Sequence, residues 1–410
     1  MRRILAILLF VSAARAQGDF YLKDGDRVVF YGDSITDQRL YTTFTESYVV
    51  TRFPKMKVTF VHSGWGGDRV SGGGGGPVEL RLERDVFAYN PTVLTIMLGM
   101  NDGSYRAFNP DIFERYSAGY ESIIRTVKQK LPEVRITAIQ PSPYDDVTRP
   151  PAFAGGYNAV LVRYGKFLAE LASRENLALA DLNTPVVAAL KKAKTLDREL
   201  ALKLLPDRVH PGAGGHLLMA GALLRAWQAP ALVSSAEIDA DSKKVTAANT
   251  EVSVLYTADA LTWTQEDAAL PMPLDPKDPA LALALKASDF NRTLNRQTLA
   301  VKGLTRARYV LRIDGEFAGS FSRQDLAEGV DLGAMPTPMA KQALEVHALT
   351  LKRAAIHNAR WRQVQVPMQD TKAGRLQAAL DSLDALEAEL VEQQRAAAQP
   401  KPRRYELTPE

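Results

Sequence analysis

Residues 28–37, VVFYGDSITD, join a short apolar run to a glycine, an aspartate and a serine. The run Val28–Tyr31 is rich in β-branched and aromatic residues, which predicts a buried β-strand. Gly32 and Asp33 then predict a turn, so Ser34 stands just beyond the carboxyl end of that strand. Two interpretations of Ser34 remain open at this point. It is either a turn serine that caps a helix, which is the commoner role, or a nucleophile that faces a pocket.

Apolar runs of the same kind recur along the first half of the chain and alternate with helical patterns. The predicted strands are residues 27–31, 57–62, 92–98, 135–140 and 177–182. The predicted helices are residues 41–53, 77–89, 110–130, 157–175, 184–194 and 214–228. Five β–α repeats predict an α/β domain with a parallel sheet, helices on both faces and right-handed crossovers. We assign this domain to residues 17–230.

The β–α alternation stops near residue 235. Strand-like stretches follow at residues 251–257, 281–287, 297–303 and 308–321. The last of them holds Asp314-Gly315 between two alternating runs, which is a hairpin signal. Residues 270–279 form a proline-rich loop. Residues 235–335 are therefore predicted to be a small β-rich domain, or a β extension packed on the first domain.

Residues 336–410 are predicted to form C-terminal helices and an extended tail. The helices are expected at residues 339–361 and 371–395. Five leucines of the second helix share one stripe: Leu376, Leu380, Leu383, Leu386 and Leu390. Such a stripe fits the seam of a homodimer as well as the more common packing of a helix on its own domain.

The first residues, MRRILAILLFVSAARAQ, have the pattern of a secretory signal. Two arginines precede the apolar run Ile4–Val11, and Ala14-Arg15-Ala16 provides a cleavage site before Gln17. A retained anchor and a buried N-terminal strand are the alternatives. The apolar run is too short to span a bilayer as a helix, so no membrane span is expected after cleavage of residues 1–16. A secreted or periplasmic location is predicted.

The charge balance gives no argument for a nucleic-acid partner. Cleavage removes three arginines and leaves 48 Lys and Arg against 47 Asp and Glu, so the mature chain is close to neutral. The sequence has no cysteine, which excludes disulfides and thiolate metal or redox chemistry.

Three polar loops follow the first three predicted strands: GDSIT, HSGWGGDRV and GMNDG. Because open parallel sheets bind ligands at the carboxyl edge, we expect Ser34, Gly67 and Asn101 to lie on one rim. Downstream, LPDRVHPGAGGH supplies Asp207 and His210, three residues apart. Each of these features is a common turn or surface motif when it occurs alone.

Together the five residues supply the groups that acyl transfer needs. A serine requires a base, and histidine has a suitable pKa; the histidine in turn requires an acceptor, which Asp207 provides. The developing oxyanion requires fixed donors. The backbone N–H groups of Ser34 and Gly67 and the side-chain amide of Asn101 are the candidates.

In this combination the chain resembles the GDSL, or SGNH, hydrolase superfamily, whose marker residues are Ser, Gly, Asn and His. The resemblance covers about residues 27–228 and is carried by Ser34 in GDSIT, Gly67 in GWGGD, Asn101 in GMND, and Asp207 with His210 in DRVHP. It implies a flavodoxin-like three-layer α/β/α fold and a serine esterase or lipase that uses neither a metal nor another cofactor. The β-rich and helical C-terminal extension lies outside the resemblance.

Two positions depart from the family pattern. Ile35 follows the nucleophile where the family name has leucine, which is a volume-conserving change. His62 stands where many members carry asparagine. It either tunes the oxyanion loop or, as we favour, caps the end of its strand.

The glycine run 72–76 leads from the oxyanion turn into a helix. Pro77-Val78-Glu79 follows it in place of Gly-Lys-Ser/Thr, so nucleotide binding is not expected. The run is either a mobile rim of the pocket or a flexible connector.

The sequence therefore predicts an exported serine esterase that forms an acyl-enzyme through a Ser-His-Asp triad. The expected substrates are small-molecule or carbohydrate carboxylic esters, with acetyl esters among the candidates. A metal-dependent phosphoesterase with Asp33, Asn101, Asp207 and His210 as ligands is one alternative. A non-catalytic binding or scaffold protein is the other.

Overall fold

The computed structural model describes residues 20–256 and 260–410, so the predicted signal, residues 1–16, lies outside the described residues. The predicted five-stranded parallel sheet is confirmed, with strand order β2-β1-β5-β6-β7 and every pairing parallel. Its strands are β1 (Arg27–Gly32), β2 (Thr59–Gly64), β5 (Val93–Met97), β6 (Arg135–Ile139) and β7 (Ala178–Ala180). β1 and β5 are buried almost throughout, as strands covered on both faces should be.

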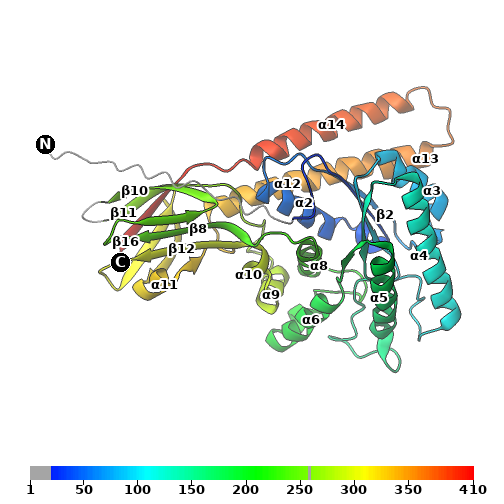
Figure 1. The fold of residues 1–410 in the computed structure, drawn as a ribbon, viewed down its shortest axis with the longest axis horizontal. Helices are drawn as coiled ribbons and strands as arrows, with labels where there is room; N and C mark the ends of the chain where they lie inside the picture. The colour runs from blue at the N-terminus through cyan, green and yellow to red at the C-terminus, as the bar shows by residue number, and fades with distance from the viewer. Residues whose placement is uncertain (1–19, 257–259) are drawn as a thin grey trace.

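Helices cover both faces of this sheet (Figure 1). Helices α2, α6 and α8 pack together on one side, and α3, α4 and α5 lie on the other. Their bounds are α2 (Leu40–Arg52), α3 (Val78–Asp85), α4 (Pro110–Lys130), α5 (Gly156–Glu175), α6 (Thr184–Leu196) and α8 (Ala213–Ala226). The flavodoxin-like three-layer α/β/α fold is thereby confirmed.

A β-sandwich follows the α/β domain. One sheet has the order β10-β11-β16-β13-β14 and the other β15-β12-β8-β9. The strands are β8 (Leu232–Asp239), β9 (Val245–Ala248), β10 (Thr250–Tyr256), β11 (Leu261–Asp267), β12 (Arg296–Lys302), β13 (Arg308–Ile313), β14 (Glu316–Ser322), β15 (Val330–Asp331) and β16 (Arg403–Pro409). Side chains from both sheets, Ile238 and Trp263 among them, share one buried core. The tail of the chain supplies β16, which lies between β11 and β13.

The strand expected at residues 281–287 is wrong: this stretch is helix α9 (Pro279–Ala287). Asp278 caps it by accepting hydrogen bonds from the amides of Ala280 and Leu281, and Pro279 occupies the first turn. The alternation of leucine and alanine imitates a strand, yet both residues favour helix. Leu281 and Ala284 are buried, and the helix packs against α6 and α8.

Two long helices lie side by side and run from the sandwich to the α/β domain (Figure 1). They are α12 (Pro338–Asn358), which continues through a π-helical segment (Ala359–Gln365) into α13 (Val366–Met368), and α14 (Leu376–Ala397). Leu380 of the predicted leucine stripe is buried, whereas Leu386 is 40% exposed. α14 packs on α12, and the homodimer seam remains a prediction. Among the described residues, no helix has the length and apolar character needed to cross a membrane.

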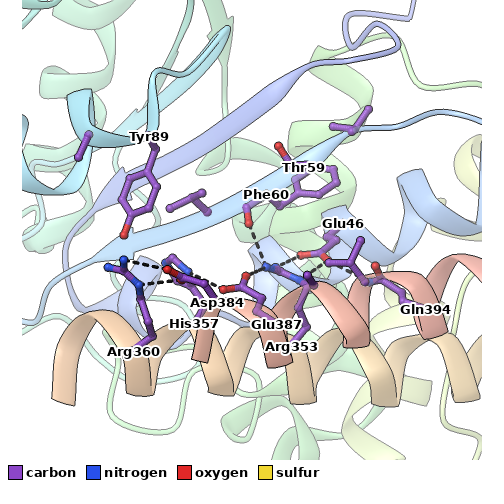
Figure 2. Close-up of a pocket in the computed structure, with 15 residues that line it drawn as sticks. Glu46, Thr59, Phe60, Tyr89, Arg353, His357, Arg360, Asp384, Glu387 and Gln394 are labelled. Atoms are coloured by element: carbon purple, nitrogen blue, oxygen red, sulfur yellow. Dashed lines mark hydrogen bonds and ion pairs between the residues drawn. The ribbon is translucent and has the colours of Figure 1, made fainter. Parts of the chain in front are cut away.

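A buried ion pair between Glu46 of α2 and Arg353 of α12 joins these helices to the α/β domain (Figure 2). Arg353 donates to the two oxygens of Glu46 at 2.9 and 2.5 Å, and to Glu387 of α14 at 2.7 Å. It also donates to the carbonyl of Phe60 at 3.1 Å, which covers part of the otherwise open edge of β2. Gln394 adds a hydrogen bond to Glu46 at 2.9 Å. A cavity of about 460 Å³ lies beside this network, between β2 and the two helices.

The charge of Arg353 decides the ionisation of Glu46. Burial acts to raise the pKa of Glu46, but the Arg353 charge and a hydrogen bond from His62 outweigh it and lower the pKa to about 2. A carboxyl whose pKa is lowered on folding stabilises the folded state above its unfolded value. That stabilisation is lost as the pH falls from about 4.5 towards 2.

We expect Arg353→Ala to lower the free energy of unfolding at pH 7 by about 3–5 kcal/mol, because it leaves Glu46 buried and unpaired. Adding Glu46→Gln should restore part of this loss, and the difference from wild type should shrink below pH ~4.5 as Glu46 gains its proton. Urea unfolding gives both quantities. Lys341→Ala, which breaks the exposed pair with Glu316, is the control and should cost about 1 kcal/mol or less. An equal loss of unfolding free energy in Arg353→Ala and in Lys341→Ala would contradict a special role for the buried pair.

Candidate active site

Ser34 is the first residue of the short helix α1 (Ser34–Asp37), directly beyond the end of β1. Asp33 caps this helix, because its Oδ1 accepts a hydrogen bond from the amide of Ile35 at 3.0 Å. Burial raises the pKa of Asp33 to about 7. The strand order reverses between β1 and β5, so Ser34 lies at the topological switch point, where open α/β sheets bind ligands.

Two glycines allow the turn of Ser34 to lie directly on the ends of β1 and β2. A Cβ on Gly32 would lie 2.3 Å from Oγ1 of Thr36 and 2.8 Å from the carbonyl oxygen of Met97. A Cβ on Gly64 would lie 2.1 Å from the amide nitrogen of Asp37. No other residue fits at either position without moving the backbone, so these glycines allow the first two loops of the candidate site to lie together.

His210 connects Ser34 to Asp207. Its Nε2 lies 2.8 Å from Oγ of Ser34, and its Nδ1 lies 2.7 Å from Oδ2 of Asp207. The other oxygen of Asp207 accepts from the amides of Val209 at 3.0 Å and His210 at 2.7 Å, so the turn itself holds the carboxylate in place. The structure thus brings the three residues predicted as a triad into one hydrogen-bonded chain.

The hydrogen-bonded series of Ser34, His210 and Asp207 lies at an exposed rim of the domain. The side chains of Asp207 and His210 are 57% and 37% exposed. Partial burial acts to raise the pKa of the Asp207 carboxyl, but hydrogen bonds from His210 and Val209 outweigh it and hold the pKa below its usual range. Asp207 therefore stays ionised and able to accept from His210 at neutral pH. The cavity of Figure 2 is lined by neither Ser34 nor His210.

Asn101 follows β5 and is held by two hydrogen bonds. Its Nδ2 donates to the carbonyl of Asp68 at 3.0 Å, and its Oδ1 accepts from the hydroxyl of Tyr105 at 2.9 Å. These contacts fix which way the amide points and use one of its two N–H bonds. The second N–H remains as a donor for a bound oxygen.

Gly67 stands at the tip of the loop after β2. Its φ of +79° lies in the left-handed region, which favours glycine. Among the residues that the structure describes, its amide has no acceptor. The amide of Ser34 begins α1 and is not needed by that helix. The predicted donors are thus available in the protein, and their role in catalysis remains a prediction.

Sequence reasoning missed the residues that support the loop after β2. Arg81 of α3 donates to Asp68 at 2.8 Å and to the carbonyl of Ser63 at 2.8 Å, and it pairs with Asp85. All four side chains are buried. The only signal was the presence of acidic residues and arginines near the motif, which by itself is not distinctive.

Tyr105 was also missed. Its ring is 43% exposed beside Asn101 and lies 6.2 Å from the ring of Tyr144 and 5.1 Å from that of Tyr157. Ser104 and Tyr105 both have left-handed φ values, 56° and 55°, an uncommon conformation for residues other than glycine. This backbone places an aromatic surface next to the predicted oxyanion donor.

His62 neither caps its strand nor faces the oxyanion loop. Its Nδ1 lies 2.7 Å from Oγ1 of Thr42, and its Nε2 lies 3.2 Å from Glu46 and 3.0 Å from Arg353. It therefore belongs to the buried network that holds the C-terminal helices, and our preference for a cap is wrong.

The glycine run 72–76 forms a small ribbon, β3 (Gly72–Gly73) and β4 (Gly76–Pro77). A Cβ on Gly75 would lie 2.6 Å from the ring of Trp65 and 2.7 Å from Cδ of Arg81, so the run allows close packing on these side chains.

The ligands of the alternative metal-dependent site are not grouped together. Asp33 is buried as the cap of α1, while Asp207 is engaged by His210 and its own turn. Within residues 20–256 and 260–410, no three or more His, Asp or Glu side chains gather in a way that could hold a metal ion.

Some known proteins resemble only the α/β domain of this chain, and one resembles nearly the whole chain. Residues 30–218 match the model of the GDSL-like lipase/acylhydrolase family. An acetylxylan esterase of Geobacillus stearothermophilus is 26% identical over 220 residues, which are 49% of this chain and 93% of the esterase. A solved structure of a gut microbial diltiazem-metabolizing enzyme is 26% identical, with a TM-score of 0.81 over 95% of this chain and 98% of that one. The second likeness includes the C-terminal extension.

Proposed function

We propose that this chain, whose residues 30–218 belong to the GDSL-like lipase/acylhydrolase family, hydrolyses carboxylic esters by way of an acyl-enzyme formed on Ser34. The chain is an ester hydrolase on the strength of that family and of its acetylxylan esterase relative. The Ser34-His210-Asp207 triad is our proposal for how the ester is hydrolysed. One observation carries it: the hydrogen-bonded chain from Ser34 through His210 to Asp207, with distances of 2.8 and 2.7 Å.

In this mechanism Oγ of Ser34 attacks the ester carbonyl while Nε2 of His210 takes its proton. Asp207 accepts from Nδ1–H, which leaves Nε2 free for Ser34 and stabilises the imidazolium that forms. His210 then gives the proton to the leaving alcohol. A water molecule attacks the acyl group in the second half, with His210 again as base, and Ser34 is regenerated.

The tetrahedral intermediates carry a negative oxygen, which the amides of Ser34 and Gly67 and the Nδ2 of Asn101 stabilise. The Asp68 carbonyl and the Tyr105 hydroxyl hold Asn101 in place before substrate binds. Donors fixed in advance contribute most, because no reorganisation is required as charge develops.

The substrates we propose are acetyl esters of small molecules or carbohydrates. The acetylxylan esterase relative supports the acetyl group, and the exposed positions of Asp207 and His210 leave room for a bulky alcohol at the rim. The exposed ring of Tyr105 offers a face on which a sugar or an aromatic alcohol can stack. We propose secretion or periplasmic export on the basis of the pattern in residues 1–16.

We expect Ser34→Ala to abolish hydrolysis of p-nitrophenyl acetate and of acetylated xylo-oligosaccharides, because no other group takes the acyl chain. Circular dichroism and thermal unfolding should match the wild type. Ser117→Ala, on the outer surface of α4, is the matched control and should be fully active. Near wild-type activity of Ser34→Ala would refute the acyl-enzyme on this residue. A panel of p-nitrophenyl esters of rising acyl length, assayed in parallel, tests the preference for acetyl groups.

We expect Asn101→Ala to lower kcat by roughly 10²–10³-fold with a smaller change in KM, because the lost donor acts mainly on the developing oxyanion. Steady-state kinetics on an acetyl ester measures both constants. A change confined to KM would instead place Asn101 in ground-state binding of the substrate.

We expect Asp207→Asn to lose activity substantially and His210→Ala to lose more, because the first change leaves the base present but poorly oriented. Neither residual rate should depend on added divalent metal. The measurement is kcat/KM for both variants with and without a chelator. Wild-type kcat/KM for Asp207→Asn would mean that another group orients His210.

A further inference from the structure

The C-terminal extension reaches the loops of the candidate active site at the end of α12. Oδ1 of Asn358, the last residue of α12, accepts a hydrogen bond from Nη1 of Arg39 at 3.0 Å. Arg39 follows α1 in the chain, has a left-handed φ of 59°, and also pairs with Asp37 of α1 at 3.4 Å. The helix that begins with Ser34 is thus tied to a residue more than three hundred positions away.

The π-helical segment beyond Asn358 packs against the loop after β2. Trp361 is buried, donates its indole N–H to Asp85 at 2.6 Å, and meets Trp65 edge-on with ring centroids 5.8 Å apart. The guanidinium of Arg362 lies over the face of the Trp65 ring, and those of Arg81 and Arg84 lie farther away, each with its carbon 5.2 Å from the ring centroid. Trp65 is therefore enclosed partly by its own domain and partly by the extension.

Trp65 begins the loop that carries one predicted oxyanion donor, Gly67, and that holds a second, Asn101, through the carbonyl of Asp68. Its amide donates to the carbonyl of Gly32 at 3.0 Å, and its carbonyl accepts from the amide of Asp68 at 3.1 Å. Gly67 lies inside this turn, and the carbonyl of Asp68 holds the amide of Asn101 at 3.0 Å. A shift of the Trp65 backbone would therefore move Gly67 and the acceptor that holds Asn101.

Arg362 of the π-helical segment is half-buried and faces the ring of Trp65. Its Nη1 is buried without a hydrogen-bond partner, and within the described residues it forms no ion pair. Asp37 and Asp68 attract its charge, whereas Arg81 and Arg84 repel it. Its guanidinium lies over the face of Trp65, with the Trp361 ring farther away at 5.9 Å, which is the arrangement of a cation–π interaction.

We propose that Arg362 is a positioning residue of the candidate active site, which acts by stacking on Trp65 and so fixing the loop of Gly67 and Asp68. This inference rests on the proposed function, since it assigns the extension a part in stabilising the oxyanion. The extension is then a component of the catalytic centre.

The test is Arg362→Ala, compared with Arg360→Ala on the same segment. Arg360 carries the same charge but binds Asp384 of α14. We expect Arg362→Ala to lower kcat for an acetyl ester roughly 10- to 100-fold with KM little changed, because misplaced donors weaken transition-state binding. Inhibition by phenylboronic acid, which forms a tetrahedral adduct with an active serine, should weaken by a similar factor. Arg360→Ala should keep the wild-type kcat.

Arg362→Lys keeps the charge without the planar stacking group and should show an intermediate loss. It serves as the second variant if Arg362→Ala does not fold. A kcat of the folded Arg362 variants within twofold of wild type overturns the proposal, as does an equal loss in Arg360→Ala. Ser34→Ala keeps the two claims apart: if it is inactive while Arg362 variants are normal, the proposed function stands and only this inference fails.

Discussion

At the carboxyl ends of β1 and β2, the turn that carries Ser34 lies so close to the sheet that Gly32 and Gly64 have no room for a side chain. At Gly64 the backbone of α1 sets this contact, and at Gly32 the hydroxyl of Thr36 and the carbonyl of Met97 set it. It brings the first turn of α1 and the loop after β2 together before any side chain of the candidate site is considered. His210, Asp207 and Asn101 are then added from later segments, each held by hydrogen bonds within its own turn or to its neighbour.

The C-terminal extension packs against the same edge of the α/β domain. Arg353 joins α12 to Glu46 and to the open edge of β2, and the π-helical segment continues this contact to Trp65. A buried ion pair contributes little net stability in comparison with apolar packing, because its desolvation is costly. It also orients α12, since Arg353 meets acceptors on α2, β2 and α14 at once.

Local pattern was sufficient for much of the fold. The five strands of the parallel sheet are continuous apolar runs, a pattern that indicates burial on both faces, and Pro110 and Pro338 mark the starts of helices. Residues 281–287 were mistaken for a strand because alternation was given more weight than helix propensity and the cap at Asp278. Ser34, Gly67 and Asn101 could be selected from motifs at strand ends, and Asp207 and His210 from the motif DRVHP.

The residues around that set could not be selected in this way. His62 and Arg353 are 291 positions apart, and no local pattern identifies such a pair before the fold is known. Trp65 and Arg362 are separated by a similar length of chain, and their contact depends on how α12 docks. Tyr105 adopts a left-handed backbone that its own sequence does not favour.

The position of β16 has a consequence for how the protein is made. Residues 403–409 pair with β11 on one side and β13 on the other, so they fill the middle of their sheet. During synthesis the α/β domain emerges first and has all of its own strands while later residues are still being added. The sandwich sheet, in contrast, has a gap at its centre until residues 403–409 leave the ribosome. For that interval the facing edges of β11 and β13 are unpaired, which makes the nascent sandwich the part of the chain most in need of protection from aggregation.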